Sequence, residues 1–404
     1  MSSKKTAHTL FVLTSVNAFV AALSYTLTIL LANFLGPSKF GIYSQIMILA
    51  GLLSIMTKFG TEQTAATRFV KVKSASQVMS NVFAIKLLIS IPCFLVLIMI
   101  YAPNYMLIVC VFLVVLKEFD LSFFYEIEKK NERYSYINLF SKLAYVIGAL
   151  ALILISYSEL LGYFILLGVL LSLSFLFQLF DYKHYKFFKL SNCNKDLYGY
   201  IFECFPVTVV ALSSFAFGGF SRLILENKLG TETLGIYSLG WQIITIGTIF
   251  VGVVYRIWRL RFAEAIDSGN ITELFNHLRS YVFLVVLPIL ILSMIIALYS
   301  DLIVRILFSV EYAALSELLP LFSVYIFLIS IAGLMEMLWV ATGKTNIYMI
   351  ISLFFSSFFL IVLLEFSEGF QMSDFLAATI YFHAGSIMIL GIAWYYKFKS
   401  LFIK

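Results

Sequence analysis

Four basic side chains stand inside or at the ends of long apolar stretches of this sequence: Lys86, Lys117, Lys142 and Arg222. A charge at the centre of a bilayer costs about 2.5–3.5 kcal/mol on insertion scales, so each needs a partner or a wet cavity. Ammonium and guanidinium groups bind phosphate oxygens through charge-assisted hydrogen bonds. We therefore expect these residues to be substrate-binding groups for an anionic ligand. Lys142 and Arg222 also lie near enough to an interface to snorkel, which stays open as an alternative.

Three acidic side chains occupy similar positions: Glu118, Asp120 and Glu336. They are candidates either for coupling to an ion or for acting as counter-ions to the lysines, and the sequence does not separate these roles. On a continuous helix Lys117 and Asp120, three residues apart, share a face and partly neutralise each other. His383 has the right chemistry to shuttle a proton, but we favour a packing role for it.

The composition places these charges in a membrane protein. Of the 404 residues 62% are hydrophobic and only 12% are charged, and the mean hydropathy is +0.98. A soluble chain is about half apolar and about one-quarter charged. This excludes a soluble enzyme, a nucleic-acid binder and a disordered scaffold as descriptions of the whole chain. The net charge of +6 is explained by basic residues retained on the cytoplasmic side, without nucleic acid as a partner.

Signatures of catalysis and of metal binding are missing from the sequence. No HExxH or GxSxG motif occurs, and the GKT at residues 343–345 has Leu338 where a P-loop requires glycine. The four cysteines form no CxxC pair, so we expect no zinc site. We therefore expect no catalytic residue, no metal and no cofactor, and a protein that is not an enzyme.

Apolar runs divide the chain into twelve predicted transmembrane helices. A bilayer core about 30 Å thick needs about 20 helical residues to cross it. The predicted spans are 10–35, 42–59, 78–101, 105–127, 136–157, 160–181, 198–222, 236–258, 281–299, 318–341, 346–364 and 374–396. The runs are continuously apolar rather than alternating, which favours an all-α integral membrane protein over a barrel.

The distribution of basic residues predicts the orientation. If the N-terminus is cytoplasmic, only Lys39, Lys228 and Arg305 of the 28 lysines and arginines fall in outer loops. Five more lie in or at the ends of spans, and the remaining twenty are on the inner side. This bias places both termini in the cytoplasm.

A repeated segment indicates an internal duplication. Residues 35–44 read LGPSKFGIYS and residues 229–238 read LGTETLGIYS, with six identities in ten positions at an offset of 194 residues. Each segment joins the first and second helices of a six-helix set. We therefore predict two six-helix lobes, residues 1–190 and 191–404, with residues 181–195 as the linker. When the lobes are superposed, we expect the two copies of the motif to coincide at the outer ends of their helix pairs. In parallel repeats of this kind the substrate path runs between the lobes.

The first helix, LGPSKFGIYS and the following KFGTEQTAA (residues 58–66) together resemble the polysaccharide-transporter branch of the multidrug/oligosaccharidyl-lipid/polysaccharide exporters, and within it the O-antigen flippases. The resemblance implies a MATE-like fold in the bacterial inner membrane. It implies translocation of an undecaprenyl-pyrophosphate-linked O-antigen or other polysaccharide repeat unit, for lipopolysaccharide or surface polysaccharide biosynthesis. It also implies membrane lipids, a polysaccharide polymerase and a chain-length regulator as candidate partners.

Two other functions remain open at this stage. One is a small-molecule or drug antiporter of the same fold. The other, from the enzyme class, is a membrane polysaccharide polymerase or glycosyltransferase that acts on the same lipid. The short predicted loops disfavour the enzyme, since none is long enough to fold as a domain.

The charge bias generates a prediction about topology. Reporter fusions placed after Lys39, Lys228 and Glu368 should report an external location, because these residues lie in the predicted outer loops. Fusions after Lys73 and Lys130 should report the cytoplasm. An internal signal at Glu368 would contradict the twelve-helix topology, because it would remove the span predicted at residues 346–364.

Overall fold

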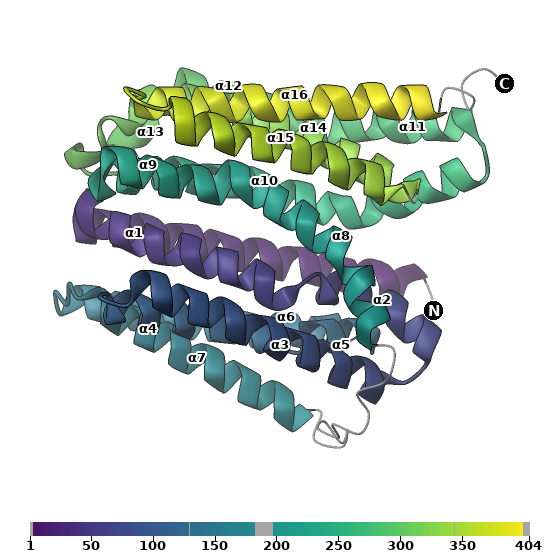
Figure 1. Cartoon of the computed structure of the whole chain (residues 1–404), viewed down its shortest axis with the longest axis horizontal. Helices are drawn as coiled ribbons and strands as arrows, with labels where there is room; N and C mark the ends of the chain where they lie inside the picture. Colours follow the sequence, from purple (N-terminus) through teal and green to yellow (C-terminus); the bar gives the residue numbers. More distant parts are fainter. Residues whose placement is uncertain (1–2, 129, 182–196, 343, 399–404) are drawn as a thin grey trace. The chain divides into compact units, whose positions relative to one another are not determined.

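The computed structural model describes residues 3–128, 130–181, 197–342 and 344–398. In these ranges the chain consists of helices joined by short connections (Figure 1), which confirms the predicted all-α class. It forms two compact units, which hold the described parts of residues 1–35 with 43–212, and of 36–42 with 213–404.

The first unit is built from helices of the N-terminal half of the chain. They are α1 (Ser3–Lys58, apart from residues 36–42), α2 (Thr61–Val72), α3 (Ala75–Tyr101), α4 (Tyr105–Val115), the 3₁₀ turn η1 (Leu116–Phe119), α5 (Ser122–Ile127), α6 (Asn131–Leu154), α7 (Leu160–Asp181) and most of α8 (Leu197–Phe215). Its inner core gathers Phe124, Tyr125 and Tyr200, all of them fully buried.

The second unit holds the C-terminal helices. They are the π-turn η3 (Ala216–Phe220), α9 (Ser221–Leu229), α10 (Thr231–Asp267), α11 (Ile271–Tyr281), the π-turn η4 (Val282–Val286), α12 (Leu287–Leu298), α13 (Ser300–Leu307), the 3₁₀ turn η5 (Val310–Tyr312), α14 (Leu315–Ala341), α15 (Thr345–Phe366) and α16 (Met372–Phe398). Within it α14 packs against α10, α12 and α16.

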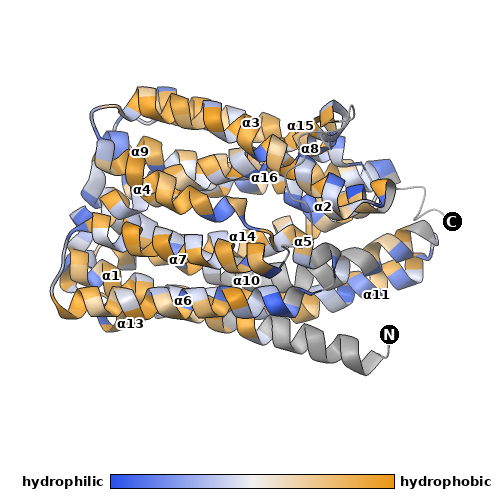
Figure 2. Ribbon diagram, turned by 90° about the horizontal axis from the view of Figure 1, so that it is seen from below, coloured by the Kyte–Doolittle hydropathy of each residue, from blue (hydrophilic) through white to orange (hydrophobic). Residues whose placement is uncertain are grey.

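The described residues contain nine helical stretches long and apolar enough to cross a membrane, and all twelve predicted spans fall on helices. One stretch, Phe19–Ala65, contains the second predicted span and most of the first. The fourth span is interrupted after α4, and the eighth lies on α10. Figure 2 shows α3 and α7 hydrophobic along most of their length. The chain is a multi-pass membrane protein.

Glycines at the start of each copy of the repeated motif end one helix and begin the next. Gly36 has φ 72° and ψ 169°, and Gly230 has φ 89° and ψ 170°. A positive φ is readily adopted only by glycine, because it has no Cβ. Pro37 follows Gly36, and proline is favoured in the first turn of a helix because its φ is already helical. The repeated Leu-Gly therefore encodes the same sharp turn twice.

The second glycine of each copy lets the two copies pack against each other, a contact that the sequence did not predict. A Cβ on Gly41 would lie 1.9 Å from the carbonyl oxygen of Thr231, and a Cβ on Gly235 would lie 2.1 Å from that of Pro37. Pro37 and Thr231 are the third residues of their copies. The contact is thus reciprocal, with the seventh residue of each copy against the third residue of the other.

The predicted linker lies outside the described residues except for Asp181, as does the predicted boundary between residues 190 and 191. The division into duplicated lobes therefore stays a prediction. By its packing, residues 197–212 of α8 belong with the helices of the N-terminal half.

The reciprocal glycine contact generates a prediction about stability. Gly41→Ala and Gly235→Ala should each lower the melting temperature of the purified protein, because the new methyl group would overlap a backbone carbonyl that cannot rotate away. Overpacking of this kind costs about 1–3 kcal/mol. Gly391→Ala is the control, since its Cβ would only touch Met335 Sδ at 3.7 Å. Equal melting temperatures for Gly41→Ala and Gly391→Ala would contradict the proposed contact.

Candidate functional site

Two lysines and two glutamates of the first unit form a ring of three ion pairs that a hydrogen bond to a backbone carbonyl closes. Lys58 Nζ lies 2.9 Å from Glu118 Oε2 and 3.3 Å from Glu62 Oε2. Lys86 Nζ lies 3.1 Å from Glu62 Oε1 and donates a hydrogen bond of 2.5 Å to the backbone carbonyl of Glu118. Ser54 Oγ donates to the second carboxylate oxygen of Glu118 at 2.9 Å. The ring has no net charge.

Two breaks in the helices bring this ring together. Phe59 and Gly60, with φ of 43° and 66°, turn the chain between α1 and α2, so that Lys58 and Glu62 meet across the corner. Gly60 is required there, because a Cβ would lie 2.7 Å from the carbonyl oxygen of Cys204. The second break is η1, where the helix tightens to 3₁₀ geometry and the Glu118 carbonyl accepts from Lys86.

Lys86 is the most deeply placed member of the ring, and its side chain is fully buried. Its ammonium group is engaged by Glu62, by the Glu118 carbonyl and by the face of Phe123, whose ring centre is 5.6 Å away. The acidic partner Glu118 serves as the counter-ion of Lys58. A substrate-binding role for Lys86 stays a prediction, and in this structure its hydrogen bonds are made to the protein.

The expectation that Lys117 and Asp120 share a helix face differs from the structure. The helix ends before Asp120, which is extended with φ −62° and ψ 165°. Its carboxylate instead accepts hydrogen bonds from Ser122 Oγ at 2.8 Å and from Tyr134 Oη at 2.6 Å. Two hydroxyl donors therefore satisfy Asp120.

Lys117 and Lys142 are set apart from the ring by their surroundings. Lys117 is exposed, and no carboxylate lies within ion-pair distance of either lysine among the described residues. Lys142 Nζ lies 5.3 Å from the ring centre of Tyr145. Lys117 interacts electrostatically with Lys142 and also with the Glu118 carboxylate of the ring. Neither lysine is held in an ion pair among the described residues.

Arg222, in the second unit, contacts neighbouring groups of the protein. Its Nε donates a hydrogen bond of 2.5 Å to the carbonyl of Gly218, and its guanidinium carbon lies 5.3 Å from the ring centre of Trp241. A substrate role for Arg222 therefore stays a prediction.

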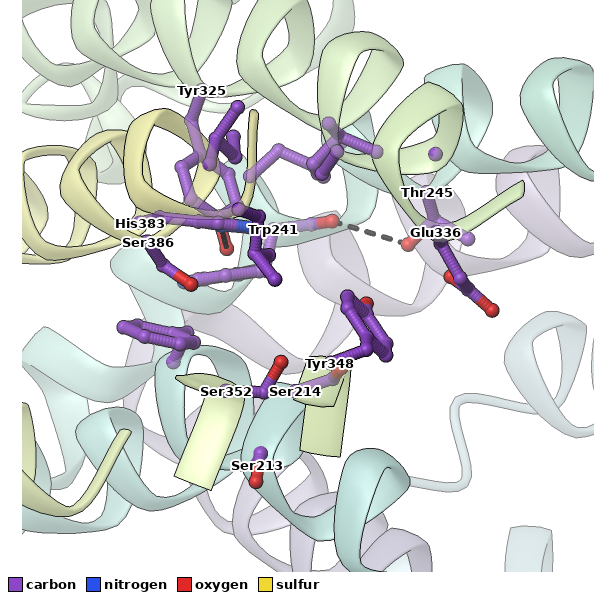
Figure 3. A pocket seen from close by; sticks show the side chains of 17 residues that line it. Ser213, Ser214, Trp241, Thr245, Tyr325, Glu336, Tyr348, Ser352, His383 and Ser386 are labelled. Atoms are coloured by element: carbon purple, nitrogen blue, oxygen red, sulfur yellow. Dashed lines mark hydrogen bonds between the residues drawn. The ribbon is translucent and has the colours of Figure 1, made fainter. Parts of the chain in front are cut away.

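The second unit contains an open cavity of about 510 Å³ (Figure 3). Its walls come from α8, η3, α10, α14, α15 and α16, and combine aromatic rings, hydroxyl groups and one carboxylate. The residues labelled in Figure 3 are Ser213, Ser214, Trp241, Thr245, Tyr325, Glu336, Tyr348, Ser352, His383 and Ser386. Of the residues proposed from the sequence, Glu336 lies in this wall.

His383 is held in the cavity wall by two contacts. Its Nδ1 is hydrogen-bonded to the hydroxyl of Tyr325 at 2.9 Å. Its ring stacks on Phe217 with centres 5.1 Å apart and planes 12° from parallel. Within the described part of the chain no group of three or more His, Cys, Asp and Glu side chains is placed to hold a metal ion.

Lys58, Glu62 and the cavity were not among the site features predicted from the sequence. The spacing of Lys58 and Glu62, which is i and i+4, was a signal for an ion pair. The serines around the cavity carried no such signal, because they come from helices far apart in the sequence.

Comparisons with known proteins agree with this architecture. Residues 7–256 match the family described as "Polysaccharide biosynthesis protein". A stretch of 127 residues is 32% identical to the amylovoran biosynthesis protein AmsL of Erwinia amylovora, and it covers 31% of this chain and about a third (32%) of that relative.

Two solved structures are similar over nearly their whole length. One is an inward-facing multidrug resistance MATE family transporter of the MOP superfamily, with a TM-score of 0.74 and 13% identity over 97% of this chain and 98% of that one. The other is a MOP superfamily transporter from Pyrococcus furiosus, with a TM-score of 0.65 and 12% identity over 97% and 96% of the two chains. At these identities the likeness shows the fold alone, and it confirms the predicted MATE-like fold.

The ring of ion pairs generates a prediction about stability. Lys86→Met should lower the melting temperature strongly, because removing one partner of a buried pair leaves an uncompensated charge, at a cost of about 3–5 kcal/mol. Lys86→Met combined with Glu62→Gln should recover much of the loss, since the ring then loses one charge of each sign.

The exposed Lys117→Met is the matched control and should melt like the wild type. If Lys86→Met melts normally but no longer supports glycan export, Lys86 is a substrate group and not a structural one.

Proposed function

This chain belongs to the polysaccharide biosynthesis protein family, and on that premise we propose that it is a flippase for a lipid-linked oligosaccharide. It moves an undecaprenyl-pyrophosphate-linked O-antigen or other polysaccharide repeat unit from the cytoplasmic to the periplasmic leaflet of the bacterial inner membrane. The repeat unit then enters lipopolysaccharide or surface polysaccharide biosynthesis.

One observation carries the proposal: a polysaccharide biosynthesis family member is folded over 97% of its length like a membrane transporter. A glycan is rich in hydroxyl groups, and burying an unpaired hydroxyl in hydrocarbon costs several kcal/mol. It therefore needs a polar route through the bilayer, whereas its polyprenyl tail can stay in lipid. Polar groups inside two helical units, such as the cavity of the second unit, suit such a divided substrate.

Lys117 and Lys142 are the residues that we assign to the pyrophosphate. Two neighbouring cations without carboxylate partners within ion-pair distance among the described residues would gain from an anion between them, because it would relieve their repulsion. Charged hydrogen bonds to phosphate oxygens are about twice as strong as neutral ones. Lys86, Glu118 and Asp120 are less suited to this task, since each is bonded within the protein.

The polymerase alternative fits the chain less well. A polymerase must bring two glycans and a catalytic group together, and the buried charges Lys86 and Glu118 are engaged in structural pairs. The family's place in polysaccharide synthesis disfavours a drug antiporter. A deletion strain separates all three functions.

We expect deletion of the gene to leave lipid-linked repeat units of normal composition on the cytoplasmic side, as measured by their protection from an impermeant glycosidase in intact spheroplasts. In proteoliposomes the purified protein should make the same glycolipid accessible. A polymerase would instead change glycan length without changing sidedness, and an antiporter would change drug sensitivity alone. Either result would overturn the proposal.

The cation pair generates a prediction about transport. Lys117→Ala and Lys142→Ala should each lower the apparent affinity for the lipid-linked substrate about tenfold, because one charged hydrogen bond is worth about 1.5–3 kcal/mol. Lys→Arg at either position should be milder.

The exposed Lys228→Ala is the control, and the measurement is the translocation rate as a function of glycolipid concentration. Wild-type concentration dependence in the double variant Lys117→Ala/Lys142→Ala would remove both residues from the site.

A further inference from the structure

We infer that the cavity of the second unit is a binding subsite for one or two uncharged sugar rings of the transported glycan. The inference rests on the proposed function and deepens it, because it assigns the glycan to particular residues. None of these residues was among the sites proposed from the sequence except Glu336.

Hydroxyl groups around the cavity are left without partners in the protein. The Oγ of Ser213 has no hydrogen bond but is buried away from the cavity space, so it is not counted among the ligand-binding groups. Ser352 and Ser386, 9% and 5% exposed, also make no side-chain hydrogen bond among the described residues, and Figure 3 shows their hydroxyls directed toward the middle of the cavity. By contrast, Ser356 on the same helix as Ser352 donates to the carbonyl of Leu353 at 3.1 Å.

This contrast indicates a polar ligand. A serine in an apolar helix ordinarily satisfies its hydroxyl on a backbone carbonyl of the preceding turn, as Ser356 does. A buried polar group that goes unpaired costs about 1–3 kcal/mol. Serines that forgo the local bond around a cavity are therefore ready for hydroxyl groups of a ligand, which can both donate and accept.

Aromatic rings supply the other half of a sugar site. Trp241 and Tyr325 meet edge to face with ring centres 5.1 Å apart, and the ring of His383 stacks on Phe217 in the same wall. A sugar ring has C–H groups on its faces and hydroxyls around its edge. Rigid aromatic surface beside a few hydroxyl and amide groups recognises such amphipathic faces at little entropic cost.

Charge and size select a neutral ring rather than the pyrophosphate or the lipid tail. Among the described residues no lysine or arginine lines the cavity, and Glu336 brings a negative charge into its wall. The volume of about 510 Å³ is within the range of about 300–1,000 Å³ of small-molecule sites. A polyprenyl chain would fill the space but leave the serine hydroxyls unpaired. The cavity therefore suits the sugars of the glycan and not its phosphate groups.

The test measures sugar binding without transport. The purified full-length protein in nanodiscs is titrated, with tryptophan fluorescence as the readout, with methyl glycosides of glucose, galactose and N-acetylglucosamine. It is also titrated with the oligosaccharide released by mild acid from the host's own surface polysaccharide. Cyclohexanol, a ring of the same size with one hydroxyl, is the control ligand, and polyprenyl phosphate tests the lipid alternative.

Three variants locate the site. Ser352→Ala with Ser386→Ala should weaken sugar binding about tenfold, since two neutral hydrogen bonds are lost, and neither change removes a bond within the protein. Ser214→Phe should abolish binding, because Ser214 is exposed in the cavity and a phenyl ring there occupies it. Ser356→Ala, outside the cavity, is the matched control and should bind like the wild type.

The outcomes separate the inference from the proposed function. Saturable binding of a sugar but not of cyclohexanol, lost in Ser214→Phe, supports the subsite even if glycolipid sidedness never changes, in which case the flippase proposal fails alone. Normal translocation by all cavity variants, or binding of polyprenyl phosphate in place of sugar, overturns the subsite and leaves the flippase proposal standing.

Discussion

A polar group carried into the apolar part of this chain has to find its partner within the protein, because the bilayer core offers no water to replace it. The ring follows this constraint most completely. It consists of Lys58, Glu62, Lys86 and Glu118. Each charge faces an opposite charge, and the remaining donor of Lys86 is satisfied by a backbone carbonyl. The ring joins α1, α2, α3 and η1, so the packing of the inner half of the first unit depends on it.

The same constraint explains where the helices break. At Phe59 and Gly60 the chain turns so that Lys58 and Glu62 can meet, and at η1 the helix changes geometry beside the ring. An unbroken helix would have placed Lys117 and Asp120 on one face, where they could partly neutralise each other. The break instead gives Asp120 two hydroxyl donors and leaves Lys117 exposed. The break at η1 thus separates Lys117 from Asp120 and leaves the ammonium group of Lys117 exposed.

Polar groups that have a partner within the protein and polar groups that lack one therefore have different roles. The ring has no net charge and its polar groups are bonded to one another, so it stabilises the fold and leaves few groups free to bind a ligand. Lys117 and Lys142 on one unit, and the serines of the cavity on the other, keep hydrogen-bonding capacity unused by the protein. Each of these groups is described within its own unit, and each differs from the ring in the same way.

The sequence by itself determined the helices, the membrane setting and the repeat, because each depends on the properties of neighbouring residues. Apolar runs of about 20 residues specify spans whatever lies beside them, and the two Leu-Gly turns are encoded by residues that tolerate a positive φ. The reciprocal contact of Gly41 and Gly235 was not predicted, because the repeat identifies equivalent positions and does not say that they touch. Tertiary structure alone decided which charges pair and where a cavity opens. Glu62 lies 24 residues from Lys86, and the cavity serines come from three helices, α8, α15 and α16. The partner of a polar group is set by the packing of such distant helices, and no local pattern of hydropathy records it.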